Sequence, residues 1–367
     1  MGTREQADAP GRRSAADRYD VVVIGGGAAG LGGALTLARA RRSVLVVDEG
    51  RPRNAPASGI HGYLGLDGTP PAELLAAGRR EVTGYGGEIV TGTVATAQRL
   101  ADGAGFRVVT ADGSSVTAAR LLVTTGLTDE LPQVPGLAAR WGREVLHCPY
   151  CHGWEVRDEP IGILSSGPFG VDQALMWRQW SKDVTLFLHT GPEPSDEEYE
   201  RLAAREIAVV DGEVTGVEVT GDRLAGIRLA DGRTLPCRAV VVAPRFTARA
   251  AFLAGLGLDV TERERSGHVF ATHIAAGPAG ATGVPGVWVA GNVTDPTAQV
   301  NAAAVGGNLA GAAINADLTA EETDLAVAER RASATVTPAT GTPAAATPAT
   351  GTRTATDLTT TDRKAHR

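Results

Sequence analysis

The sequence predicts an α/β protein with two Rossmann-like three-layer domains. Residues 19–50 run from an apolar strand-like segment through a helix-like segment of small residues to a second apolar segment. Residues 160–190 repeat that order about 140 residues later, and short apolar runs such as "RAVVVAP" and "GVWVAGN" follow. Strands that alternate with helices in this way are typical of doubly wound parallel sheets.

The first unit carries a phosphate-binding pattern. Gly25, Gly27 and Gly30 form G-x-G-x-x-G directly after "YDVVVI", where glycine permits a tight turn and close approach to a pyrophosphate. Asp48 ends the next strand about 20 residues on, where an acid can bind a ribose hydroxyl. We therefore expect dinucleotide binding, the alternative being a glycine-rich turn with a structural role only.

Composition excludes several classes of function. The chain has 367 residues, enough for two ordinary domains, with 43% apolar and 21% charged residues. Its net charge is −7 and it contains only two lysines, so we expect no nucleic-acid or membrane partner. No apolar run approaches the roughly 20 residues that cross a bilayer, and the polar N-terminus resembles no secretory signal, so we expect a cytoplasmic protein.

Two of the three cysteines lie in "EVLHCPYCHGWEV", residues 144–156. C-x-x-C-H can attach a c-type haem, cysteine and histidine can bind zinc, and C-x-x-C can be a redox disulfide. A cytoplasmic location disfavours haem, and without a second Cys or His pair at metal-ligand spacing we expect no metal. A redox pair of Cys148 and Cys151 remains, while Cys237 in "LPCRAVVV" is expected to be a buried structural thiol.

Four separated motifs resemble the thioredoxin-reductase-like, FAD-dependent pyridine nucleotide-disulfide oxidoreductases. They are "GGGAAG", "TTG" at Thr124–Gly126, the C-x-x-C, and "VWVAGNVTDPTAQVNAAAVGG". The resemblance implies a discontinuous FAD domain with an inserted NAD(P)-type domain, and a homodimer. It places the FAD domain in residues 18–126 and 245–318 and the insert, which carries the cysteines, in 127–244. Residues 1–17 and the Thr/Ala/Pro-rich 319–367 are expected to be mostly disordered tails.

The resemblance also implies which residues hold FAD. Gly25, Gly27, Gly30 and Asp48 would bind the adenosine and pyrophosphate. Gly291, Asn292 and Gln299 would follow the ribityl chain and isoalloxazine, with Asn292 replacing the usual aspartate of the family. Asn54 and His61 lie in a loop expected near the flavin, although each could be an ordinary loop residue. The other residues expected at the cofactor are Ala28, Ala29, Val94, Thr125, Gly126 and Val300.

In this family one cysteine faces the flavin and the other exchanges disulfides with the substrate. By position, Cys151 would be the flavin-proximal thiol and Cys148 the interchange thiol. His152 stands where ordinary thioredoxin reductases carry aspartate, so C-x-x-C-H-G is closer to the dithiol oxidases of the gliotoxin and holomycin type. We expect His152 to act as a base, the alternative being a packing or capping role, and we assign His147 a structural role.

The second nucleotide-type turn departs from the NADPH pattern. It reads "ILSSGPFG", with Ser165 in the place of a glycine and with Pro168 and Phe169 in the turn. Proline lacks an N–H for an anion, and phenylalanine can fill the space that a pyrophosphate needs. Only His189 replaces the basic pair that would select a 2′-phosphate, so NADPH use is doubtful. Trp177 and Trp180, expected on the following helix, are assigned to packing.

These features predict an FAD-dependent thiol-disulfide oxidoreductase. The favoured reaction is oxidation of a small-molecule or peptide dithiol to its disulfide, with O2 reoxidising the flavin. One alternative is a thioredoxin-disulfide reductase that uses NADPH or another donor, with a thioredoxin-like protein as partner. Another alternative is a flavoprotein that senses redox state without turnover.

Overall fold

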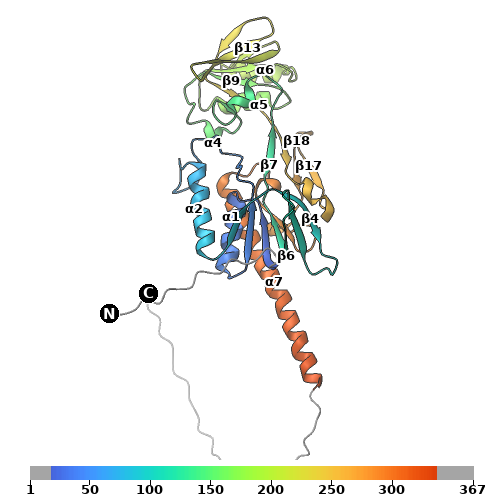
Figure 1. The fold of residues 1–367 in the computed structure, drawn as a ribbon. Helices are drawn as coiled ribbons and strands as arrows, with labels where there is room; N and C mark the ends of the chain where they lie inside the picture. The colour runs from blue at the N-terminus through green and yellow to red at the C-terminus, as the bar shows by residue number, and fades with distance from the viewer. Residues whose placement is uncertain (1–17, 337–367) are drawn as a thin grey trace, which may run out of the picture. The chain divides into compact units, whose positions relative to one another are not determined.

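The computed structural model describes residues 18–336. The first of its sheets has seven strands in the order β3-β2-β1-β6-β5-β4, with β19 paired parallel to β6 (Figure 1). β1, β2, β3 and β6 are parallel, as the predicted βαβ unit requires. The strands are β1 (Arg18–Ile24), β2 (Val44–Asp48), β3 (Glu88–Thr91), β4 (Val94–Arg99), β5 (Phe106–Thr110), β6 (Ser115–Val123) and β19 (Val287–Val289).

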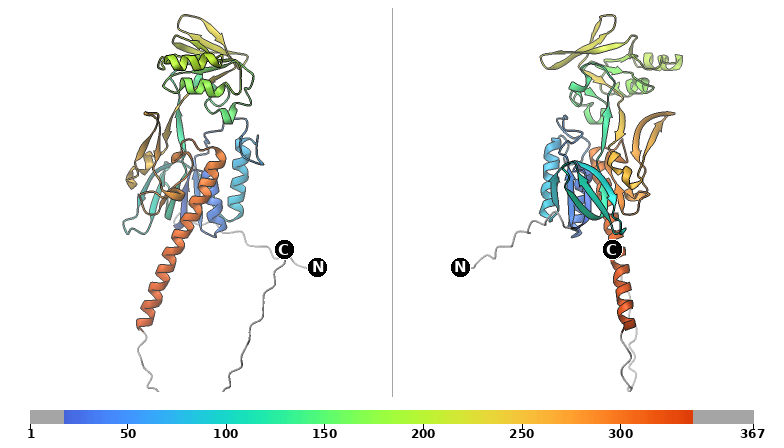
Figure 2. Two further views of the ribbon diagram at one scale, coloured as in Figure 1. Left: turned by 180° about the vertical axis from the view of Figure 1, so that it is seen from behind. Right: turned by 45° about the vertical axis from the view of Figure 1, so that its right-hand side comes forward.

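Helices cover one face of this sheet. They are α1 (Ala28–Arg39), α2 (Pro71–Gly84) and the beginning of α7 (Val300–Val336), and Figure 2 shows them from two directions. α1 and α7 approach very closely, and glycine at position 307 permits this, since a Cβ atom there would overlap the carbonyl of Ala29. The other face packs against the short helix η1 (Ala251–Leu256) in a second apolar core.

The second sheet has five parallel strands in the order β11-β10-β9-β15-β8. They are β8 (Val145–Leu146), β9 (Ile161–Leu164), β10 (Val184–Phe187), β11 (Ala208–Val210) and β15 (Ala239–Val241). α5 (Gly170–Trp177) and α6 (Asp196–Ala204) pack on one face. The antiparallel β12 (Val214–Thr220), β13 (Arg223–Leu229) and β14 (Thr234–Pro236) pack on the other. The predicted class, α/β with two Rossmann-like domains, is confirmed.

The chain crosses between the two sheets twice. It leaves the first sheet in β7 (Leu127–Glu130) and returns in β16 (Arg245–Ala248), and these strands pair antiparallel with each other. β16 also pairs with β18 (His268–Ile274), which forms a hairpin with β17 (Val260–Arg265). The remaining short elements are α3 (Leu137–Arg140), α4 (Pro149–His152), η2 (Pro278–Gly280) and η3 (Gly291–Val293).

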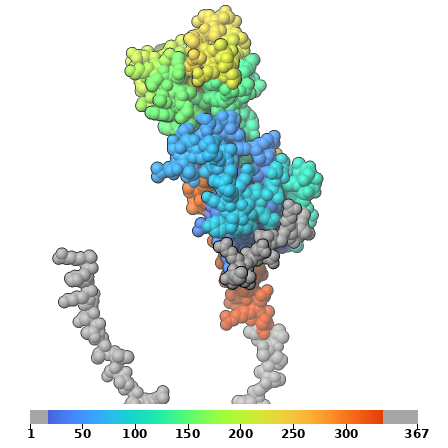
Figure 3. Space-filling model, turned by 60° about the vertical axis from the view of Figure 1, so that its left-hand side comes forward, coloured from blue at the N-terminus to red at the C-terminus, as the bar shows by residue number. Residues whose placement is uncertain are grey.

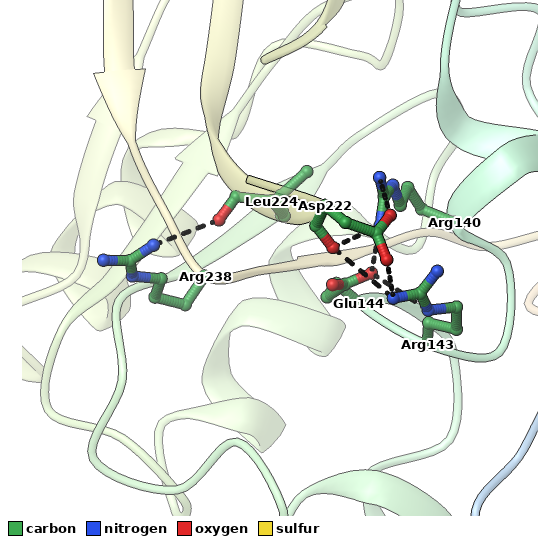
Figure 4. Close-up of polar contacts among 6 residues, drawn as sticks. All are labelled: Arg140, Arg143, Glu144, Asp222, Leu224 and Arg238. Atoms are coloured by element: carbon green, nitrogen blue, oxygen red, sulfur yellow. Dashed lines mark hydrogen bonds and ion pairs between the residues drawn. The ribbon is translucent and has the colours of Figure 1, made fainter. Parts of the chain in front are cut away.

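An ion-pair cluster anchors the segment that leads into β8 and the cysteines (Figure 4). The buried Arg140 donates to the carboxylate of Asp222 at 2.7 Å and to its carbonyl at 2.8 Å. Arg143 reaches the other carboxylate oxygen of Asp222 at 3.1 Å, and Glu144 lies 3.7 Å from Arg140. The turn between β12 and β13 therefore holds the strand from which the C-x-x-C emerges.

Two expectations from the sequence are corrected. α7 continues to Val336, so residues 319–336 are helical rather than a disordered tail, since Ala, Leu, Glu and Arg are good helix formers and proline first recurs at Pro338. α5 ends at Trp177, so Trp180 lies beyond the helix. The tails expected at residues 1–17 and 337–367 lie outside the described residues. No helix among residues 18–336 is long and apolar enough to cross a membrane.

Candidate active site

The predicted glycine turn forms an open cradle at the start of α1. Gly25 has φ of +106°, and a Cβ atom there would lie 2.6 Å from the carbonyl oxygen of Thr124, so only glycine fits. Gly30 packs against the carbonyl of Gly25, which lets α1 approach β1. Gly27 is the N-cap of α1 and has no atom within 4 Å of where its Cβ would be. The first N–H groups of α1 therefore face open space that suits an anion.

Asp48 closes one side of this cradle. Its Oδ1 accepts a hydrogen bond of 3.0 Å from the backbone N–H of Gly26, and its Oδ2 pairs with Arg79 of α2. The carboxylate is therefore fixed at the end of β2, where an acid can reach a ribose hydroxyl. Arg79 was not found from the sequence, because it lies 31 residues away and belongs to no motif.

The cradle opens into a cavity of about 930 Å³. All of the residues that we expected at a cofactor or in catalysis line it except Gly30, which packs beneath the turn. Asn54 and His61 come from the loop after β2, Thr125 and Gly126 follow β6, and Val94 begins β4. The volume, the free helix N-terminus and the acid at the strand end fit a dinucleotide such as FAD.

Asn292 organises the opposite wall. Its amide donates to the carbonyls of Asp295, Pro296 and Ala298 at 3.1, 3.4 and 2.9 Å. These bonds fix the turn that delivers Gln299 to the cavity, so the amide has a structural task that the aspartate usual in the family could not perform as a donor. The side chain still lines the cavity together with Gly291.

The cysteine pair lies in the same cavity at the N-terminus of α4. Both thiols are free and half-buried, and Cys148 is the N-cap. The Cys151 thiol donates to the sulfur of Cys148, and the N–H groups of Cys151 and Tyr150 support it, so the pKa of Cys148 falls to about 7. The same hydrogen bond raises the pKa of Cys151. Cys148 is therefore the more acidic thiol of the reduced pair.

Neutral imidazoles flank the pair. Burial lowers the pKa of His152, so its ring is a neutral proton acceptor at physiological pH, although nearby Glu155 opposes this shift. Burial also lowers the pKa of His147 to about 4, and its ring packs edge-on against Phe246 with centroids 5.1 Å apart. His152 thus has the protonation state that a base needs, while the packing of His147 matches the structural role expected for it.

Arg53 brings a positive charge to the thiols. Its guanidinium makes two bonds of 2.7 and 2.6 Å to Asp129 on β7 and lies over the Phe246 ring at 5.2 Å. It lines the cavity and lowers the pKa of both cysteines, although for Cys151 the other effects dominate. No sequence pattern revealed this residue, because its acidic partner lies 76 residues away.

Two side chains of the second nucleotide-type turn pack against their surroundings, while a Cβ atom at Gly167, the counterpart of Gly27, would have no atom within 4 Å. Ser165 is buried, its hydroxyl donates to the carbonyl of Gly167 at 3.2 Å, and it occupies the space beside Gly170 and Gly191. Phe169 is turned toward the β17–β18 hairpin. The Arg265 guanidinium lies 4.2 Å from its ring centroid and the His268 ring lies edge-on at 6.3 Å.

The residues beside this turn also differ from a nucleotide site. The backbone N–H of Gly25 donates to the carbonyl of Val47, and the N–H of Ser165 donates to the carbonyl of Phe187 in the same way. Asp48 follows Val47 and Leu188 follows Phe187, so the buried Leu188 occupies the position of Asp48 in the second unit. The Nδ1 atom of His189 accepts a hydrogen bond of 3.0 Å from Val214, and burial lowers the pKa of the ring. His189 is therefore a neutral structural residue, whereas the arginine that does lie near the turn, Arg265, comes from a distant hairpin.

A glycine cradle of the dinucleotide-binding type and a C-x-x-C pair thus open into one cavity. The chain belongs to the pyridine nucleotide-disulphide oxidoreductase family, whose model matches residues 19–316. Thioredoxin reductase sirT of Leptosphaeria maculans is 30% identical over 316 residues, 81% of this chain and 93% of the relative. Thioredoxin reductase tcpT of Claviceps purpurea is 38% identical over 181 residues, 47% of this chain. The match spans only 56% of tcpT and 50% of thioredoxin reductase aclD of Aspergillus oryzae.

Solved structures agree with this assignment. The crystal structure of HlmI is 45% identical with a TM-score of 0.79, over 87% of this chain and 98% of that one. An oxidoreductase from Agrobacterium tumefaciens is 35% identical with a TM-score of 0.76, over 83% and 99%. The predicted resemblance to the thioredoxin-reductase-like family is confirmed.

Proposed function

We propose that this protein is an FAD-dependent dithiol oxidase that converts a small-molecule or peptide dithiol to its disulfide. The observation that carries the proposal is the contrast in what reaches the large cavity. The cysteines, His152 and the glycine cradle all line it, whereas no residue of the second turn does, and Ser165 and Phe169 of that turn pack against other parts of the protein. This supports entry of electrons through the thiols rather than from NADPH.

The proposed reaction begins with Cys148 and Cys151 joined as a disulfide. His152 accepts a proton from a substrate thiol, and the resulting thiolate attacks the sulfur of Cys148, which releases Cys151 as a thiolate. The Cys151 thiolate takes the proton of the second substrate thiol, and the resulting thiolate attacks the substrate sulfur of the mixed disulfide, which frees Cys148 as a thiolate and releases the oxidised substrate. Two electrons thus pass to the cysteine pair, and the two substrate protons are left on His152 and Cys151.

Bound FAD would take the electron pair from the cysteines and pass it to O2, which becomes hydrogen peroxide. Gly25–Ala29 and Asp48 would hold its pyrophosphate and ribose, and Gly291, Asn292 and Gln299 would hold the flavin end. Arg53 would favour thiolates over thiols beside it. Because reduced Cys148 is already favoured as the thiolate, the pair is poised to give up electrons near neutral pH.

Steady-state assays test the proposal directly. Purified protein with dithiothreitol and air should consume O2 and form an equal amount of peroxide. Cys148→Ser and Cys151→Ser should each lower turnover by at least about 10³-fold, and His152→Asn by about 10²-fold or more if it is the base. Turnover that survives in both cysteine variants would contradict the proposal.

A thioredoxin-disulfide reductase is the second candidate. The names of sirT and tcpT favour it, and Arg265 beside the second turn offers one cation for a nucleotide phosphate. In that case NADPH would supply electrons and a thioredoxin-like protein would receive them. A homodimer is expected for either function from the family resemblance.

A further inference from the structure

A second, smaller cavity of about 360 Å³ lies against the turn that carries the cysteines. Pro149 and Tyr150, the two residues between the cysteines, form part of its wall. His61 lines both this cavity and the large one, so the two share a wall residue. Figure 3 shows the face on which the blue N-terminal segments border the green segments of the second sheet. The full lining is His61, Gly62, Asp67, Pro149, Tyr150, Trp154, Glu155 and Trp180.

Three aromatic side chains form the apolar part of this cavity. Tyr150 and Trp154 are 65% and 66% exposed, which is unusual for such large rings. Trp180 lies edge-on to Tyr150 with centroids 5.6 Å apart. Gly153 makes this packing possible, because a Cβ atom there would lie 2.8 Å from the Trp180 ring. The packing of Trp180 thus explains why glycine stands at this position of C-x-x-C-H-G. The exposed rings of Tyr150 and Trp154 leave apolar area that a ligand can cover.

Two carboxylates form the polar part. Nδ1 of His61 lies 3.3 Å from Asp67, and its Nε2 lies 3.4 Å from Glu155. Within residues 18–336, His61 is the one basic side chain within 4 Å of either carboxylate, and Asp67 is held ionised because the Gly62 N–H and His61 lower its pKa. No lysine or arginine lines the cavity.

The aromatic wall already attracts a cation. The Arg157 guanidinium lies 4.1 Å from the Trp154 ring centroid, although Arg157 is outside the cavity lining. Aromatic faces together with carboxylates are the groups that recognise ammonium ions, and they repel carboxylates and sulfonates. The cavity thus has an acidic part and an aromatic part, and Pro149 and Tyr150 in its wall directly follow Cys148, which lines the large cavity.

We infer that this cavity binds the non-reacting part of the dithiol substrate and selects a dithiol that carries a protonated amine. The inference rests on the proposed dithiol oxidation and names its substrate class. A dithiol whose thiols reach Cys148 places its remaining atoms against Pro149 and Tyr150. An ammonium group there meets Asp67, Glu155 and the ring faces, whereas an anionic group meets the same carboxylates unfavourably.

Pairs of dithiols with similar carbon skeletons and different charges test the inference. Dithiothreitol is neutral, and 2-amino-1,4-dimercaptobutane has the same four-carbon dithiol skeleton with an ammonium group. 2,3-Dimercaptopropanol and 2,3-dimercaptopropane-1-sulfonate form a neutral and anionic pair. The second-order rate constant for anaerobic flavin reduction is measured for each compound, in Asp67→Asn and Glu155→Gln as well as the wild-type protein. Comparing each preference between variants cancels the intrinsic reactivity of the thiols.

The wild-type protein should prefer the amine over dithiothreitol, and the alcohol over the sulfonate, each by about tenfold at low salt. Both preferences should shrink several-fold in Asp67→Asn and in Glu155→Gln, and at high salt. Glu159→Gln is the matched control: this exposed acid lies four residues after Glu155 and outside the cavity, so the preferences should stay at wild-type values.

A second readout does not depend on turnover. In Cys148→Ser, a simple non-thiol amine such as 1,4-diaminobutane should alter tryptophan fluorescence saturably, and Trp154→Phe in that background should weaken the response. Equal preferences in the wild-type protein and both acid variants would overturn the cavity assignment. Failure of all four dithiols to reduce the flavin would instead overturn the proposed oxidation, so the two failures can be told apart.

Discussion

The two strand–turn–helix units of this chain start from the same plan and end differently. In the first, α1 begins at Ala28, directly after Gly27, and the space beside Gly27 is open, as it is beside its counterpart Gly167. In the second, the residue equivalent to Ala28 is Pro168, and α5 begins only at Gly170. Three substitutions thus remove an N–H, delay the helix, place a hydroxyl beside Gly170 and Gly191, and direct a ring toward the β17–β18 hairpin.

The difference shows how a fold can keep a domain while its binding turn changes. The five-stranded sheet needs its apolar strands and the α5 and α6 faces, and these are intact. The turn needs small residues only if a phosphate approaches it. Ser165 and Phe169 make contacts within the protein, and the sheet holds β8, the strand that leads into the cysteines.

Exchanging the turns should give the largest effect. Placing Gly25→Ser, Ala28→Pro and Ala29→Phe in the first unit recreates the second turn there. Serine at φ of +106° is strained, proline removes one N–H that would donate to a charged group, at a cost of about 1.5–3 kcal/mol, and the phenylalanine ring adds bulk beside the cradle. Flavin retention should fall by about 10²-fold or more, measured as absorbance per protein after dialysis. A variant that keeps its full flavin would show that this turn is not the cradle.

Changing the cysteine pair should have an effect of intermediate size on the reactivity of Cys148. Alkylation of Cys148 by iodoacetamide should rise with pH through about 7, because the thiolate reacts. Cys151→Ala removes the main donor to that thiolate, so the pKa of Cys148 should rise. For each unit by which this pKa rises, alkylation at pH 7 should slow by about tenfold. Alkylation is followed by mass spectrometry of the peptide. An unchanged pH profile would mean that Cys151 does not support the thiolate.

The reverse exchange should have little effect. Ser165→Gly, Pro168→Ala and Phe169→Ala reopen the second turn, yet Leu188 still stands in the place of the ribose-binding acid. Flavin retention should match the wild-type protein, and flavin reduction by NADPH should rise only a few-fold. A rise of 10³-fold would indicate that the turn alone limits nucleotide use.

The smallest effect should come from the cluster that anchors β8. Arg143 and Arg140 lower the pKa of Asp222 below its usual 3.8. Its stabilising contribution is therefore present above pH 3.8 and is lost as pH falls through the lower folded value. Asp222→Asn should lower the urea midpoint of unfolding slightly at pH 7. The difference in midpoint between the variant and the wild-type protein should become smaller toward pH 3. Flavin content at pH 7 should be unchanged, as it should be in the exposed control Asp231→Asn.

Short sequence patterns were sufficient for the parts of the site that are local. The G-x-G-x-x-G turn and the C-x-x-C each place several functional atoms within six residues, so their geometry follows from the chain itself. The two sheets could also be predicted from the sequence, because apolar strands between turns can pack in only a few ways. The limits of α5 and α7 were less predictable, since helix ends depend on contacts as well as composition.

The contacts between distant segments could not be read from the sequence. Arg79 and Asp48 are 31 residues apart, Arg53 and Asp129 are 76 apart, and His61 lies 94 residues before Glu155. None of these pairs has a local spacing that marks it. Trp180 was assigned to packing, and its second role at the small cavity depends on Gly153 and Tyr150 of another segment.

One measurement tests the central claim most directly: anaerobic stopped-flow reduction of the bound flavin by NADPH, by NADH and by a dithiol, followed by exposure to air. The dithiol should bleach the flavin readily, both nucleotides should act slowly or not at all, and air should restore the colour with peroxide formed. Rapid, saturable reduction by micromolar NADPH would contradict it and would favour the reductase.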